Sequence, residues 1–190
     1  MFTSPFKKLS NASEKKLLIL AIATFLLAAT CMIQFDVLLK NDLAPFGIIS
    51  FELAKTLDHS AQILASWQAT EGAMQSAAWS LWFDYVFIIT YTFLLCLLIH
   101  RTARIVWTNQ ESLGYRLGIV LLRMVIFAAF LDMVENFALL QLFYGDLQSH
   151  WSSLAFATAT LKFIQIIFGI LYVIINLIIV GIKKITHVKK

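Results

Sequence analysis

Four long runs of apolar residues dominate the chain, at residues 17–39, 77–99, 117–143 and 154–182. A helix needs about 20 apolar residues, at a rise of about 1.5 Å each, to cross the hydrocarbon core of a bilayer. Every one of the four runs reaches this length. The pattern therefore predicts an all-α integral membrane protein, with four transmembrane helices forming one bundle in a single domain over residues 1–190.

The connection between the first two runs, residues 40–76, is too long for a plain turn and carries a helical pattern of its own. Pro45 is well placed to open a helix, which we expect over about residues 46–66. Two sets of residues take opposite faces of that helix, the apolar Ile49, Leu53, Leu57, Ala61 and Leu64 and the polar Glu52, Lys55, His59 and Gln62. This pattern predicts an extracytoplasmic amphipathic helix that lies on the membrane surface or caps the bundle, with Trp67 and Trp79 at the headgroup level.

The composition supports the membrane class. The chain is 60% hydrophobic and 14% charged, against roughly 45–50% and 25% in soluble domains, and its mean hydropathy is +0.81. Disordered, collagen-like and disulfide-rich proteins are excluded. A net charge of +4 would suggest nucleic acid as a partner of a soluble chain, but here the basic residues flank the spans, so the expected partners are membrane lipid, a second copy of the chain or another membrane subunit.

Positive residues near the ends of spans stay in the cytoplasm and so predict the orientation. Eleven of them flank one side of the predicted bundle: Lys7, Lys8, Lys15, Lys16, Arg101, Arg104, Arg116, Lys183, Lys184, Lys189 and Lys190. The other two connections hold only Lys40 and Lys55. We therefore expect both termini in the cytoplasm and a multi-pass protein of a bacterial-type inner membrane. A cleaved signal peptide is the alternative for the first run, but that run is longer than a usual signal core.

Several ionisable residues lie inside the predicted spans, where each costs roughly 2.5–3.5 kcal/mol even on a lenient scale. Arg123 lies near a cytoplasmic end and can extend its long side chain to the membrane surface. Asp84, Asp132, Glu135 and Lys162 all fall in the outer half of their spans, about 3–9 Å from the midplanes. This shared depth predicts one polar layer in the bundle.

Helical spacing adds to this layer. Asp132, Glu135 and Asn136 are spaced i, i+3 and i+4, so they share one face of the third span. Two further polar stripes run along the fourth and second spans, Thr158, Lys162, Gln165, Gly169 and Asn176 on one and Ser80, Asp84 and Tyr91 on the other. Gln34 and Asp36 are placed at the mouth of such an interior. The candidate ligand- or ion-binding residues are Asp84, Asp132, Glu135, Asn136, Lys162 and Gln165.

The charges of this set do not balance. Three carboxylates against one ammonium would leave a net charge of −2 in a low-dielectric bundle, so one or two carboxyl groups hold protons, or water or a cation completes the site. Oxygen ligands suit protons and hard cations. No haem and no zinc are expected, because His59, His100, His150 and His187 share no face and Cys31 and Cys96 lie far apart.

Three functions fit this pattern. The first is a small binding or transport module for a cation, a proton or a lipid headgroup at the carboxylate cluster. The second is an intramembrane enzyme that acts on a lipid-like substrate through paired carboxylates, Asp132 with Asp84 or Glu135. The third is a structural subunit of a membrane complex, in which the polar residues hold helices together.

Overall fold

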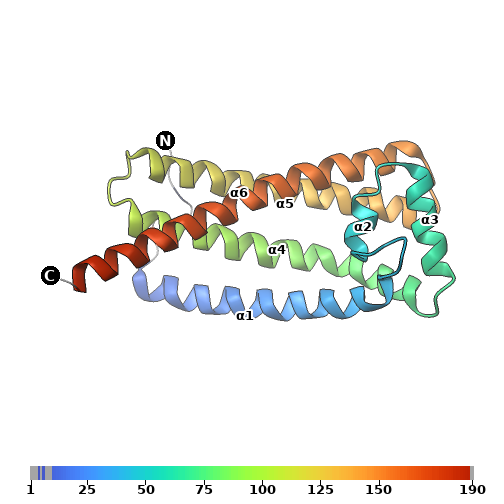
Figure 1. Ribbon diagram of the computed structural model, residues 1–190, viewed down its shortest axis with the longest axis horizontal. Helices are drawn as coiled ribbons and strands as arrows, with labels where there is room; N and C mark the ends of the chain where they lie inside the picture. Colours follow the sequence, from blue (N-terminus) through green and yellow to red (C-terminus); the bar gives the residue numbers. More distant parts are fainter. Residues whose placement is uncertain (1–3, 5, 7–9, 189–190) are drawn as a thin grey trace.

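The computed structural model describes residues 4, 6 and 10–188, which contain helices and no strands (Figure 1). Its four long helices are α1 (Asn11–Asp36), α4 (Ala73–Val106), α5 (Leu113–Phe143) and α6 (Ser149–Val188). Each is long and apolar enough to cross a membrane, which confirms the four predicted spans. The residues Lys7, Lys8, Lys189 and Lys190, used to predict the orientation, lie outside the described residues, as do the side chains of Lys184 and His187.

α1 and α5 begin before their apolar runs, and a serine caps the start of each helix. The side chain of Ser10 accepts a hydrogen bond from the backbone N–H of Ser13 at the start of α1. Ser112 does the same for Tyr115 at the start of α5. Each bond satisfies one of the four free N–H groups at the beginning of a helix.

The long helices form an uneven bundle. α5 and α6 make the most extensive contact, although the last part of α6 runs past the start of α5 (Figure 1), α4 packs against both, and α1 packs mainly against α4. Figure 1 shows α1 at the edge of the bundle beside α4, with both chain termini at one end and α2 and α3 at the other. Large apolar side chains such as Leu27, Ile89 and Phe130 are exposed on the outside of the helices, as expected for surfaces that face lipid.

α1 is held to α4 by small residues and by one buried acid. Ala21 and Ala28 are buried, and their small side chains let the two helices approach closely. At the end of the bundle that carries the termini, Glu14 is 0% exposed. Its carboxylate pairs with Arg101 at 2.8 Å and Arg104 at 2.7 Å. These arginines therefore fix α1 as well as adding positive charge at this end.

The helical segment expected between the first two spans is present as two helices, α2 (Ile48–Glu52) and α3 (Leu57–Gln68), after the short 3-10 turn η1 (Val37–Leu39). Pro45 does not open a helix: Gly47, with φ of +58°, directly precedes α2. A second helix begins where Thr56 accepts a hydrogen bond from the N–H of His59. Because residues 53–56 between α2 and α3 are not helical, the residues of the two helices do not follow one helical phase.

Because of this interruption, the predicted division of the segment into one apolar and one polar face is wrong at several residues. Glu52, expected on the polar outer face, is 9% exposed and points into the bundle, whereas the apolar Ile49 and Leu53 are exposed. Trp67, expected at the headgroup level, is fully buried, and its Nε1–H donates to the carbonyl of Leu39 at 2.8 Å. Trp79 is exposed, and its place at the headgroup level stays a prediction. α2 and α3 thus close one end of the bundle, and α2 brings a carboxylate inward.

Asp146 organises the connection between α5 and α6, outside the membrane-spanning segments. Its carboxylate accepts hydrogen bonds from Trp151 Nε1–H at 2.7 Å and from Gln148 Nε2–H at 2.8 Å. These bonds stabilise the charged form and lower the pKa of the Asp146 carboxyl below its usual value.

Candidate functional site

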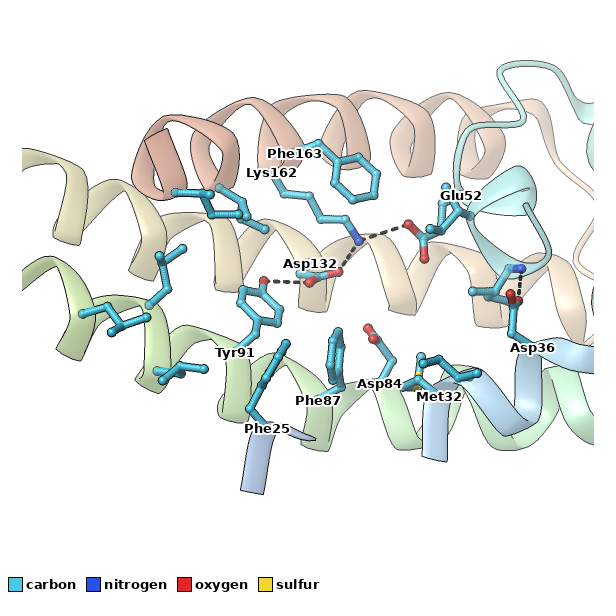
Figure 2. Close-up of a pocket in the computed structure, with 18 residues that line it drawn as sticks. Phe25, Met32, Asp36, Glu52, Asp84, Phe87, Tyr91, Asp132, Lys162 and Phe163 are labelled. Carbon is cyan, nitrogen blue, oxygen red and sulfur yellow. Dashed lines mark hydrogen bonds and ion pairs between the residues drawn. The ribbon is translucent and has the colours of Figure 1, made fainter. Parts of the chain in front are cut away.

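Lys162 is the centre of the polar interior (Figure 2). Its side chain is on α6, only 5% exposed, and its Nζ contacts carboxylates from two other helices. Asp132 Oδ1 lies at 2.5 Å and Glu135 Oε1 at 2.8 Å, both on α5. Glu52 Oε2, on α2, lies at 3.3 Å. One ammonium group thus joins α2, α5 and α6.

Helix geometry explains why these groups meet. Asp132 and Glu135 are three residues apart on α5, so both side chains leave the helix on the face that packs against α6. Gly169 allows close packing on α6, because an added Cβ would lie 3.1 Å from the side chain of Val125 on α5. Close packing of the two helices brings the lysine within hydrogen-bonding distance of both acids.

Asp132 and Asp84 differ in how many of their carboxylate oxygens are hydrogen-bonded. Tyr91 Oη–H donates to Asp132 Oδ2 at 2.8 Å, so both oxygens of Asp132 are engaged. Asn136 Nδ2–H donates to Asp84 Oδ2. Within the described part of the chain Asp84 has no ion pair, and its only hydrogen bond is this one through Oδ2. Its other oxygen, Oδ1, is therefore available to a ligand.

The charges remain unbalanced, and more strongly than the sequence predicts. With Glu52 included, four carboxyl groups surround one ammonium group, which would give a net charge of −3 if all were ionised. Glu135 Oε2 is buried and accepts no hydrogen bond in the described structure, and the buried Glu52 Oε2 has the shared Lys162 at 3.3 Å as its partner. A buried charge without compensation is costly, so the cluster is suited to hold protons or to receive a positive group.

A cavity of about 490 Å³ lies against this cluster, within the roughly 300–1,000 Å³ of small-molecule sites. Five charged residues from five helices line it: Asp36, Glu52, Asp84, Asp132 and Lys162. Asp36 is fixed at its edge, because its Oδ1 accepts from the N–H of Ile48 at 2.8 Å and its Oδ2 lies 3.3 Å from Lys40. The other lining residues are apolar or aromatic.

The structure brings five of the six candidate residues together: Asp84, Asp132, Glu135, Asn136 and Lys162. Gln165, one turn further along α6, makes no hydrogen bond to them, and its Oε1 is buried without a hydrogen-bond partner among the described residues. Glu135 contacts Lys162 and Asn136 contacts Asp84, but neither side chain lines the cavity. That the set holds a ligand stays a prediction.

Sequence reasoning missed Glu52 as a member of the cluster. The assumption of one continuous helix over residues 46–66 placed it on the solvated face. The available signal was Thr56, a residue type that favours the position before a helix, followed by Asp58 in the first turn. This signal indicates that a new helix begins after Thr56, so it does not fix which way the side chains of the preceding helix point.

Within the described residues, no three His, Cys, Asp or Glu side chains are arranged to hold a metal ion. Comparison with protein-family models, with curated proteins and with solved structures gives no significant match to this chain.

Proposed function

We propose that this polytopic membrane protein is a small binding or transport module that takes up a positively charged group at its intramembrane carboxylate cluster. The observation that carries the proposal is Asp84. It lines the cavity, makes no ion pair in the described structure and has one oxygen without a hydrogen bond. A cation beside it would reduce the excess negative charge of the cluster, which favours its binding.

The geometry favours binding over chemistry by paired acids. An acid pair that activates water needs a carboxylate oxygen free to take a proton. Both oxygens of Asp132 are engaged, one with Lys162 and one with Tyr91. Glu135 does not line the cavity. These contacts support Lys162 as an internal counter-ion that organises the site and Asp84 as the residue that meets the ligand.

Thermal unfolding of the purified protein tests the proposal. The wild type is titrated with ethylammonium, sodium or magnesium chloride, and choline chloride at equal ionic strength serves as a bulky reference cation. A ligand that binds the folded state raises the melting temperature in a saturable way. We expect at least one of the three cations to do so.

Two variants make the test specific. Asp84→Asn keeps the size of the side chain and removes its charge, so we expect it to abolish the saturable shift. Asp58→Asn is the matched control, because Asp58 is an exposed acid on α3 that does not line the cavity. If no cation stabilises the wild type, or if both variants respond like the wild type, the proposed site is wrong.

A further inference from the structure

The cavity is charged at one end and apolar along the rest of its length. The five charged lining residues lie from the end closed by α2, where Asp36 and Glu52 are, to the middle of Figure 2, where Lys162 meets Asp132. From that end the lining continues as apolar residues along three helices. It reaches Phe25 on α1, about 16 Å from Asp36, Leu98 on α4, about 21 Å from Asp84, and Ile170 on α6, about 12 Å from Lys162. Figure 2 shows Phe25 and Phe87 beside the charged group, on the side away from α2.

The cavity also reaches the lipid-facing surface. Ile33 on α1 and Ile170 on α6 line the cavity and are at the same time 61% and 43% exposed. α1 packs mainly against α4, and α6 packs against α4 and α5. The side of the cavity between α1 and α6 is therefore the one that opens toward the hydrocarbon core of the membrane.

The charge of the polar cluster and the length of the apolar lining together indicate which kind of molecule fits the cavity. The charged end presents Asp84, which makes no ion pair within the described residues, and Glu52, whose Oε2 shares the ammonium group of Lys162 with Asp132 and Glu135. A phosphate or carboxylate headgroup would meet like charge there, whereas an ammonium group would be attracted. The apolar length of about 12–21 Å matches a hydrocarbon chain that spans one leaflet, about 15 Å.

We propose that the cavity binds an amphiphile with an ammonium headgroup and a hydrocarbon chain, which enters from the bilayer between α1 and α6. The headgroup lies between Asp84 and Glu52, and the chain lies against the apolar lining of α1, α4 and α6. This inference rests on the proposed function, since it needs a positive group at the cluster. It adds the class of ligand and the route by which the ligand arrives.

The experiment compares amines of different chain length. The protein is reconstituted in phosphatidylcholine nanodiscs, and its melting temperature is followed with ethylamine, octylamine and dodecylamine. Each added methylene that leaves water contributes favourably, so we expect dodecylamine to act at a concentration at least about tenfold lower than ethylamine. Sodium dodecyl phosphate, with the same chain and a negative head, should give no saturable stabilisation.

Substitutions on one helix separate specific binding from partition into the lipid. Ile170→Trp fills the apolar part of the cavity, whereas Ile174→Trp, at a residue that is 47% exposed and lies one turn further, does not touch it. We expect Ile170→Trp to remove the advantage of dodecylamine over ethylamine and Ile174→Trp to keep it. If the two variants behave alike, or if ethylamine acts as well as dodecylamine, the chain does not lie in this cavity.

The two proposals fail in different ways. Stabilisation by ethylamine that depends on Asp84 but not on chain length would overturn the amphiphile and leave the cation site standing. Loss of every amine effect in the wild type would overturn the amphiphile, and it would overturn the cation site as well if sodium and magnesium also give no saturable shift. Nanodiscs with added phosphatidylethanolamine identify the source of the amine. Competition with dodecylamine points to a bilayer lipid, and lack of competition points to a single-chain amine.

Discussion

Replacing Lys162 with methionine removes the only ammonium group in the cluster and keeps a side chain of similar length. Asp132, Glu135 and Glu52 then lose their shared counter-ion at distances of 2.5, 2.8 and 3.3 Å. Removing one partner of a buried ion pair costs about 3–5 kcal/mol, because the remaining charge stays buried. At about 2–4 °C per kcal/mol for a chain of this size, the melting temperature should fall by about 6–20 °C.

The measurement is thermal unfolding of the detergent-purified variant beside the wild type at neutral pH. Lys55→Met is the control, because Lys55 is an exposed lysine near the same end of the bundle whose contact within the described part of the chain is with the ring of Phe156.

A triple variant that also carries Asp132→Asn and Glu135→Gln should recover part of the lost stability, because it removes two of the three orphaned carboxylates together with the lysine and leaves only Glu52 without its counter-ion. This variant keeps the test informative if Lys162→Met alone does not fold. A Lys162→Met melting temperature within about 2 °C of the wild type at neutral pH would refute the reasoning, because it would mean that the lysine does not compensate these acids.

Three further predictions use the same unfolding measurement. Gly47→Ala should cost about 1–3 kcal/mol, because φ is +58° there and the new Cβ would collide with the carboxylate of Asp36; Gly145→Ala, also at positive φ but with nothing within 4 Å, should cost less. Glu14→Gln should destabilise the protein by about 1–3 kcal/mol, since it leaves two arginines of α4 without their acid; an unchanged melting temperature would contradict this. Because the pKa of Asp146 is lowered in the folded state, its contribution should be present above the ordinary aspartate pKa and disappear as the pH falls through the lowered value; Asp146→Asn should therefore differ from wild type at neutral pH and match it in strong acid.

The polar interior shows which contacts the spacing of polar residues along the sequence could predict. The i, i+3 spacing of Asp132 and Glu135 put both acids on one face, and their depth matched that of Lys162, so the contact among these three followed from helix geometry. Glu52 and Gln165 show the limit. Glu52 joins the cluster because α2 ends there and points the side chain of Glu52 toward Lys162. Gln165 lies on the expected stripe of α6 but makes no hydrogen bond to the cluster.

The amino-acid sequence by itself determined the class of this protein and its four spans, because length and apolarity are properties of each segment alone. It also determined which residues are too polar for lipid and must face inward. Only the tertiary structure decided that α1 packs mainly against α4, that a cavity opens beside α6 and that Asp84 has no ion pair among the described residues. These features depend on which helix faces pack together and on the direction of one five-residue helix, and hydrophobic periodicity within a segment carries no information about either.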